Sequence, residues 1–409
     1  MKIKRKIYDQ IGVHLKEKEI TMLIGPRQAG KTTIMKALAM DLEKDGFMYI
    51  YLNLDVERDM ETVSSQENFL AYLKNQFTDF GYVFIDEFQK KENAGAFLKG
   101  LYDMNLPYKF IISGSGSIEL KERTHESLAG RKRLFVIYPL SFEEFALYKS
   151  DYRYSNLKDL HQFDTVLEEV LIEEYLKYGG YPRVVLSSTN EEKYLQINEI
   201  VESFLHKDAL SFIKYEKLDD MRNLIKALAV YNANVFSYEK LSQSTRMSSI
   251  TIKNYIRYLE ETHILERVLP FSNNKINEIV KMPVIYFIDI GLLNYCLGNF
   301  GIKKNEKDGF IFQNIIWRIL KEIHIIEIRH WRTKDHKEID FIVEKGNDLY
   351  AIEVKYSKNL RMNKALYTFA GLYKNVRKII VCVSTKDVVN DGKNEIELVE
   401  FSALTQSIR

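Results

Sequence analysis

The sequence has few of the features that mark secreted, membrane-spanning or disordered proteins. Only two of its 409 residues are cysteine, Cys296 and Cys382, and so few cysteines cannot form a disulfide framework and lack metal-site spacing. No apolar run approaches the roughly 18 residues of a membrane-spanning helix. The basic N-terminus leads into Asp9 and Gln10 rather than the apolar core of a signal peptide. We therefore expect a soluble, cytoplasmic protein with no membrane partner.

The chain also lacks an excess of charge of either sign. Its 59 lysines and arginines nearly balance 57 aspartates and glutamates, for a formal net charge of +2. A DNA site would therefore have to be a local basic patch. The composition, with 46% hydrophobic and 28% charged residues, is that of a folded protein. Because single cores stop growing at about 250 to 300 residues, we expect two or three domains.

Hydrophobic patterning predicts an α/β fold in the N-terminal part. Apolar runs at 20–24, 48–54, 82–85 and 109–112 are typical of buried strands. The segments between them are long enough for crossover helices, which favours a parallel sheet. Because the first run leads directly into a loop with Gly25, Gly30, Lys31 and Thr32, we predict a P-loop NTPase core over residues 1–150.

The remainder of the chain is predicted to form three further units. A helical pattern over 151–215 indicates a lid or connector. Two helices followed by two strand-like runs over 216–300 are typical of a winged helix. A helix followed by several strand-like runs over 301–409 indicates a separate α/β domain. The predicted fold class is thus α/β, a parallel P-loop sheet followed by a helical lid, a winged-helix domain and a C-terminal α/β domain.

The spacing of residues 25–33 is that of a phosphate-binding loop. Between an apolar strand and a helical pattern the run reads Gly25-Pro26-Arg27-Gln28-Ala29-Gly30-Lys31-Thr32-Thr33. Backbone N–H groups of such a loop surround phosphates, and the following helix presents its positive end. We expect this loop to bind ATP, with Lys31 contacting the β and γ phosphates and Thr32 holding Mg²⁺, assisted by Thr33. The strand–loop–helix context disfavours a chance glycine-rich turn.

Two carboxylates follow the third predicted strand. Asp86 and Glu87 stand where the run 82–85 ends, at the edge where open α/β sheets bind ligands. We expect Asp86 to orient the Mg²⁺ shell and Glu87 to be the base that takes the proton of the attacking water. A solvated acidic turn is the disfavoured alternative.

Three further residues are weaker candidates for this site. Ser113 ends the fourth predicted strand and is a candidate contact of the γ-phosphate or the lytic water, with Ser115 in reserve. A purely structural strand–Ser–Gly turn is the alternative. Arg131 is a candidate charge stabiliser, in cis or from a neighbouring subunit, or else an ordinary surface arginine.

The second predicted helix of the winged helix has one apolar and one polar face. Ile252, Ile256 and Leu259 share a face and should pack inward. The outward side chains are candidates for contact with DNA phosphates and base edges, and they are Lys253, Asn254 and Arg257. Arg246 and Lys275 would add backbone contacts. The alternative is an internal connector with a solvated polar face, because nearby glutamates weaken the basic patch.

Taken in order, several motifs resemble those of the bacterial and archaeal AAA+-like ATPases that carry a winged helix and a C-terminal restriction-endonuclease-like domain. The matching segments are 25–33, 84–89, 113–115, 128–131 with 139–145, and 178–182. The resemblance implies ATP binding and hydrolysis, a connection to DNA, and homo-oligomers by analogy with AAA+ proteins. Two other hypotheses remain open, a nucleotide-dependent switch acting on protein partners and an ATP-regulated DNA endonuclease.

The C-terminal domain resembles the metal-dependent PD-(D/E)xK nuclease fold, in which an aspartate is followed by Glu-x-Lys. Here these residues are Asp340, Glu353 and Lys355. The two carboxylates would bind Mg²⁺, and the lysine would position water or stabilise phosphate charge. Related proteins often have a glutamate on the helix that opens this domain, where this chain has Gln313. Because an amide binds Mg²⁺ less well than a carboxylate, we expect weak or absent cleavage; a domain kept for binding alone is the alternative.

Overall fold

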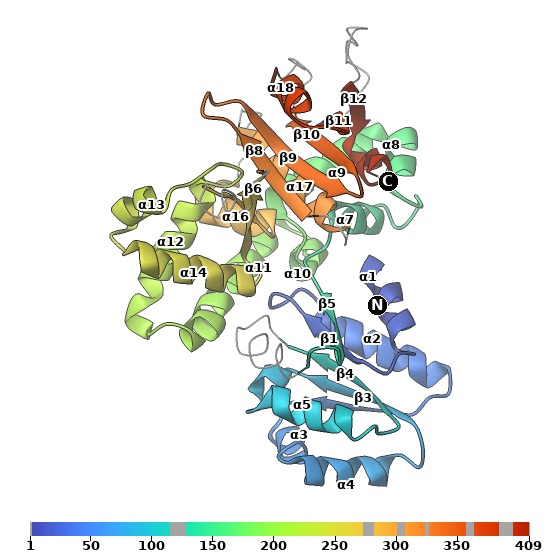
Figure 1. Cartoon of the computed structure of the whole chain (residues 1–409). Coiled ribbons are helices and arrows are strands. Elements are labelled where there is room, and N and C mark those ends of the chain that lie inside the picture. The colour runs from blue at the N-terminus through green and yellow to red at the C-terminus, as the bar shows by residue number, and fades with distance from the viewer. Residues whose placement is uncertain are drawn as a thin grey trace.

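The structure is a computed structural model that describes residues 2–114, 128–272, 282–300, 307–323, 327–356, 364–383 and 396–408. Figure 1 shows two bodies, an N-terminal one in blue and cyan and a larger one formed by the rest of the chain. No helix in these ranges is long and apolar enough to cross a membrane.

The N-terminal body is built on a parallel sheet with the strand order β2-β3-β4-β1-β5. Its strands are β1 (Ile20–Ile24), β2 (Tyr49–Asn53), β3 (Gly81–Asp86), β4 (Tyr108–Ser113) and β5 (Lys132–Val136). The first four coincide with the predicted apolar runs, so the parallel sheet is confirmed. β5 was not predicted, because charged and exposed residues fill its first half.

Helices cover both faces of this sheet. They are α1 (Lys6–His14), α2 (Lys31–Lys44), α3 (Glu57–Thr62), α4 (Gln66–Gln76) and α5 (Ala94–Asp103). On one face Ile34 of α2 packs with Phe84 of β3. On the other face Phe69 of α4 and Leu98 of α5 pack with Val83, the neighbouring residue of the same strand. The alternation of side chains along β3 thus supplies two separate cores.

A helical part follows β5. Its helices are α7 (Phe142–Lys149), α8 (Leu157–Phe163), α9 (Thr165–Tyr178), α10 (Pro182–Leu186), α11 (Asn190–Ser203), α12 (Leu218–Val230), α13 (Tyr238–Thr245) and α14 (Ser249–Glu261). Between α11 and α12 lie a π-helical turn, η2 (Phe204–Asp208), and two 3₁₀ turns, η3 (Ala209–Ser211) and η4 (Tyr215–Lys217). As predicted, Ile252, Ile256 and Leu259 face inward from α14.

The second sheet has the order β12-β11-β10-β9-β8-β6-β7. Its strands are β6 (Leu265–Pro270), β7 (Val284–Phe287), β8 (Glu327–Arg332), β9 (Glu338–Lys345), β10 (Asp348–Lys355), β11 (Val376–Cys382) and β12 (Ile396–Glu400). The hairpin β6–β7 after α14 extends the C-terminal sheet, because Leu269 pairs with Arg329 of β8. The sheet therefore crosses the boundary predicted at residue 300; the winged-helix and nuclease-like assignments remain predictions.

The remaining helices pack against this sheet or against the helical part, and they are α16 (Ile290–Leu297), α17 (Lys307–Lys321), α18 (Lys364–Leu372), the 3₁₀ turn η5 (Phe401–Ala403) and α19 (Leu404–Ser407). One apolar cluster runs from Leu140 through the helices to Ile408. The second body therefore has one large core from the helical part to the C-terminus, beside a smaller separate cluster that includes Phe271, Trp331 and Phe369.

The motif at 178–182 has a structural role in this body. A Cβ on Gly180 would lie 2.1 Å from the Leu140 backbone oxygen, so the chains pass too closely for any side chain. The Gly180 N–H donates to Asp289, which also caps α16 through the Leu292 N–H, at 2.8 and 3.1 Å. Burial raises the pKa of Asp289 to about 6, against the effect of these N–H donors.

Candidate functional site

The loop between β1 and α2 has the backbone of a phosphate-binding loop. Gly25 has φ +145°, and a Cβ there would lie 2.1 Å from the backbone oxygen of Ile137, which only glycine tolerates. Gln28 and Gly30 also have positive φ, 61° and 103°. Left-handed residues turn successive N–H groups toward one concave side, and α2 begins there with its unpaired N–H groups. The loop therefore presents an anion-binding surface at the carboxyl edge of the sheet.

Lys31 lies inside this loop rather than in solvent. Its Nζ donates to the backbone oxygens of Gly25 and Pro26, both at 2.9 Å, and the side chain is buried. Burial lowers the pKa of Lys31 to about 8, although the carboxylates of Glu87 and Asp208 act in the opposite direction. A desolvated ammonium so placed interacts strongly with any anion that enters the loop.

The carboxyl ends of three strands meet at Asp86. Its carboxylate accepts hydrogen bonds from the Ser113 hydroxyl of β4 and, at 2.9 Å, from the Tyr51 hydroxyl of β2. The Glu87 N–H donates to Asp86 Oδ1 at 3.1 Å and to Ser113 Oγ at 3.3 Å. The structure thus brings Ser113 together with the acidic pair. Tyr51 was missed by sequence reasoning, because its contact with Asp86 depends on the pairing of β2 with β3, in which Asn53 lies beside Asp86.

Glu87 has a strained backbone. It adopts φ 58°, ψ 37°, a left-handed conformation that costs a residue with a side chain of the order of 1 kcal/mol. Its carboxylate accepts a hydrogen bond from the Gln89 side-chain amide. Asp86 is fully buried whereas Glu87 is half-buried. Of these two carboxylates, Glu87 is therefore the one that a water molecule can reach.

Arg27 in the loop is bound by a residue far along the chain. Its Nε donates to both carboxylate oxygens of Asp208 in η2, at 2.8 and 2.7 Å. The main-chain oxygen of Asp208 in turn accepts a hydrogen bond from the Tyr258 hydroxyl of α14. Asp208 has no local motif and was not found from sequence.

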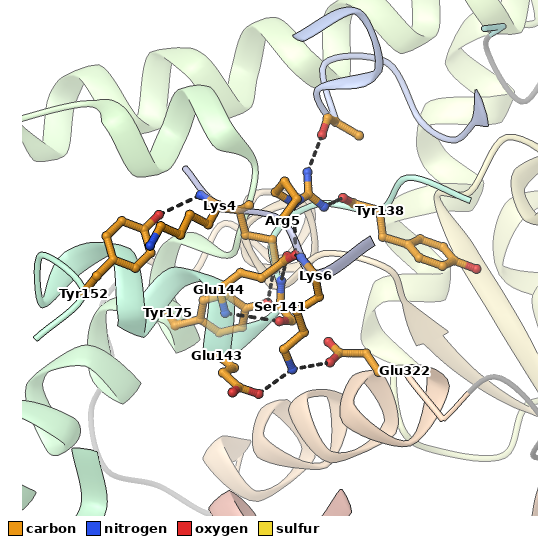
Figure 2. A network of polar contacts seen from close by, with 12 residues as sticks. Lys4, Arg5, Lys6, Tyr138, Ser141, Glu143, Glu144, Tyr152, Tyr175 and Glu322 are labelled. Atoms are coloured by element: carbon orange, nitrogen blue, oxygen red, sulfur yellow. Dashed lines mark hydrogen bonds and ion pairs between the residues drawn. The ribbon is translucent and has the colours of Figure 1, made fainter. Parts of the chain in front are cut away.

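The N-terminal arm also reaches the loop (Figure 2). The Arg5 guanidinium donates to the Ala29 oxygen at 3.1 Å, to the Tyr138 oxygen at 2.6 Å and to the Glu144 carboxylate at 3.1 Å. Lys6 contributes its backbone N–H to the same carboxylate at 2.8 Å. Arg5 therefore joins the phosphate-binding loop to the second body, a role that sequence reasoning missed.

Of the other predicted site residues, Thr32 and Thr33 lie next to the loop and Arg131 lies away from it. Thr32 is half-buried and Thr33 exposed in the first turn of α2. Arg131 pairs with Asp103 at 2.7 Å and precedes β5 where Ile20 begins β1. Four residues of strand put this point about 13 Å from the loop that follows β1. The structure thus does not support a role for Arg131 in cis, and a role from a neighbouring subunit stays a prediction. Ser115 and Lys275 lie outside the described residues.

The predicted DNA-binding side chains of α14 all point outward. Lys253, Asn254 and Arg257 are exposed. However, Lys253 lies over the Tyr238 ring, 5.2 Å from its centroid, and Arg257 pairs with Glu261 at 2.9 Å. The face is available to a partner, although part of its positive charge is balanced.

The nuclease-like residues come together on β9 and β10. The Val354 N–H donates to Asp340 at 2.8 Å and Lys355 Nζ to Glu353 at 2.6 Å. Burial, and then the Glu353 carboxylate, raise the pKa of Asp340 well above its usual range. Gln313 is buried on α17, which packs on β10, and its Oε1 has no hydrogen-bond partner among the residues described.

The donor atoms at the two sites decide whether divalent metal ions fit them. In the described ranges no group of three or more His, Cys, Asp or Glu side chains forms a metal-binding cluster. At the loop, a threonine hydroxyl and the Asp86 carboxylate fit Mg²⁺, which takes one or two protein ligands plus phosphates and waters. On the second sheet, the crowded, desolvated carboxylates of Asp340 and Glu353 and the amide oxygen of Gln313 are also oxygen donors of the kind that divalent ions require.

Three segments of the chain match known protein families. Residues 17–146 match a family described as AAA domain. Residues 169–303 and 308–402 each match a domain of unknown function, DUF8612 and DUF4143.

The curated relatives span most of the chain. An uncharacterized protein of Methanocaldococcus jannaschii is 24% identical over 96% of this chain and 89% of its own length. Uncharacterized proteins of Mycobacterium tuberculosis and Haemophilus influenzae are 24% and 23% identical over 85% and 87% of this chain, and over 72% and 87% of their own lengths.

Two solved structures overlap part of the chain. AMPPCP-bound DnaA from Aquifex aeolicus is 18% identical, with a TM-score of 0.31 over 63% of this chain and 88% of its own. PCH-2 of C. elegans is 12% identical, with a TM-score of 0.29 over 62% and 68%. The sheet, the glycine loop and the family match together establish that residues 17–146 are an AAA-type P-loop domain.

Proposed function

We propose that the chain hydrolyses ATP at the edge of the N-terminal sheet. The observation that carries this proposal is that Lys31 in the glycine loop interacts electrostatically with Glu87 and Asp86, which Ser113 joins at the ends of β3 and β4. A loop for phosphates, a buried carboxylate and a second, accessible carboxylate are the parts that phosphoryl transfer to water requires.

The residues divide the reaction between them. Backbone N–H groups of the loop and the Lys31 ammonium bind the β and γ phosphates. Thr32 and Asp86 would hold Mg²⁺, which supplies charge neutralisation at the phosphate oxygens. Glu87 takes the proton of a water whose oxygen bonds to the γ-phosphorus, and the bond to the β–γ bridging oxygen breaks to leave ADP and phosphate. Ser113 keeps the Asp86 carboxylate in position.

The test is steady-state phosphate release by the full chain with Mg²⁺ and ATP. Lys31→Ala removes the buried charge and should abolish turnover. The matched control is Lys44→Ala at the other end of the same helix, where the lysine side chain is 71% exposed and its loss should leave turnover unchanged. Turnover near that of the unaltered protein in Lys31→Ala would exclude this site.

A second element of the proposal is that nucleotide turnover alters DNA engagement. The contact that supports it runs from Arg27 to Asp208 and from the Asp208 backbone to Tyr258 in α14, the helix whose outer face carries the basic residues. A salt-sensitive rise in ATPase rate on adding duplex DNA would support this coupling. No change in rate with DNA would favour a nucleotide switch for protein partners.

A third activity, ATP-regulated DNA cleavage, rests on the closeness of Asp340 on β9 to Val354 and Glu353 on β10, shown by the Val354 N–H hydrogen bond and by the effect of Glu353 on the pKa of Asp340. Gln313 in place of a carboxylate argues for little or no cleavage. The two carboxylates would hold Mg²⁺, and Lys355 would then face the scissile phosphate. Metal-dependent cleavage of duplex DNA that is lost in Asp340→Ala would establish this activity instead.

A further inference from the structure

Arg27 of the phosphate-binding loop forms an ion pair with a carboxylate of the protein itself. Arg27 and Asp208 lie 181 residues apart in sequence, and the guanidinium Nε is within 2.8 Å of both Asp208 oxygens. The Arg27 side chain is 29% exposed and that of Asp208 9%. This is therefore a largely buried contact between the two bodies and not a surface ion pair.

Asp208 also belongs to the electrostatic environment of the nucleotide site. Its carboxylate raises the pKa of Lys31. In turn, Lys31 lowers the pKa of Asp208 and Glu87 raises it. Burial raises the pKa of Asp208 above its usual range, although Arg27 and Lys31 oppose this effect. An anionic side chain from η2 thus lies close to the groups that are to receive an anionic phosphate.

A guanidinium binds carboxylate and phosphate with the same geometry. Because Arg27 stands two residues after Gly25, in the loop that surrounds the phosphates, phosphate oxygens and Asp208 compete for one donor group. We propose that Asp208 is an intramolecular competitor of the nucleotide, which holds Arg27 in an ion pair until the phosphates of a bound nucleotide replace it. This inference rests on the proposed nucleotide site and adds a residue that regulates its affinity.

The backbone around Asp208 departs from a regular α-helix. η2 is a π-helical turn, a conformation that is rare and concentrates at functional sites. On its far side, the Asp208 carbonyl accepts from Tyr258, and Phe212 stacks on the Tyr258 ring at 4.4 Å. Loss of the Arg27 ion pair would therefore release the Asp208 side chain, while its main chain stays bonded to Tyr258.

The test is the affinity for a nonhydrolysable ATP analogue, measured by calorimetry with Mg²⁺ on four full-length proteins: unaltered, Asp208→Asn, Arg27→Ala and the double variant. Asp208→Asn should tighten binding about tenfold, the worth of one charge-assisted hydrogen-bonded pair. Arg27→Ala should weaken it by a similar factor. In the Arg27→Ala background, Asp208→Asn should change affinity less than about twofold.

An equal gain from Asp208→Asn with and without Arg27 would overturn the proposal, because the gain would then be simple relief of charge repulsion. No gain in either background would overturn it as well. The matched control is Glu397→Gln on β12 of the second sheet, which removes a carboxylate paired with Arg377 of β11 at 2.6 Å, and affinity should not change.

Hydrogen exchange on the unaltered protein tests the same idea without a substitution. Saturating analogue should increase deuterium uptake at Phe204–Asp208, and unchanged or decreased uptake there would contradict the proposal. If the unaltered protein binds no nucleotide, the proposed function itself fails; if it binds and the variants behave alike, only the role of Asp208 fails.

Discussion

Replacing Arg5 with methionine should weaken the junction between the two bodies of the molecule. The change keeps much of the apolar stem but removes the guanidinium that bonds Ala29, Tyr138 and Glu144. The Arg5 and Glu144 side chains are only 6% and 8% exposed, so the remaining carboxylate would be a buried charge without its partner.

The magnitude follows from these contacts. Breaking one side of a buried ion pair costs about 3 to 5 kcal/mol. Glu144 keeps two backbone donors, Lys6 N–H at 2.8 Å and Ser141 N–H at 3.1 Å, which places the loss at the lower end. We therefore expect Arg5→Met to lower the free energy of unfolding by about 3 kcal/mol, roughly a hundredfold in the equilibrium constant.

Urea titration followed by circular dichroism measures this loss. Arg58→Met is the matched control, because the Arg58 side chain is 87% exposed, and we expect a change of less than about 0.5 kcal/mol there. Adding Glu144→Gln to Arg5→Met should recover part of the loss, since no buried charge then remains. A loss below about 1 kcal/mol for Arg5→Met would refute the reasoning that this arginine holds the junction.

Three further predictions concern other parts of the chain. Charge reversal at Lys253 and Arg257 should weaken duplex DNA binding, and fluorescence anisotropy should show the log–log salt slope reduced by about two; an unchanged slope would favour the connector role. Gln313→Glu should tighten Mn²⁺ binding measured by calorimetry, and Asp340→Ala should cancel the gain; an unaltered affinity would mean that α17 does not reach the carboxylates. Because the folded chain raises the pKa of Asp289 from 3.8 to about 6, its contribution to stability should fall as pH rises through that window, and Asp289→Asn should remove this slope in urea titrations at pH 5 and 7.

The parts of the fold that sequence predicted well are those with a local signature. Buried parallel strands are continuous apolar runs, and β1 and β4 could therefore be placed from their composition. The sequence signature of the glycine loop lies within residues 25–33 alone. β5 could not be found in this way, because its sequence, Lys132–Val136, begins with two cations. Its place beside β1 results from pairing, which local composition does not report.

The site residues that could not be predicted are those that the fold brings to the loop from other parts of the sequence. Tyr51 reaches Asp86 from the neighbouring strand, and Asp208 and Arg5 reach the loop from the helical part and the N-terminal arm. No spacing in the sequence relates these residues to the loop. Arg131 was a candidate in cis or from a neighbouring subunit, and the parallel pairing of β5 with β1 puts it at the end of the sheet opposite the loop, which leaves only the role from a neighbouring subunit as a prediction.

The central claim, that Glu87 activates water for ATP hydrolysis, is tested most directly by single-turnover hydrolysis in the Glu87→Gln protein. The amide can hold a water but cannot accept its proton, and loss of a general base lowers such rates about 100-fold or more. We predict that Glu87→Gln binds ATP with the affinity of the unaltered protein and hydrolyses it at least about 100-fold more slowly. Hydrolysis at the original rate, with binding unchanged, would contradict the account.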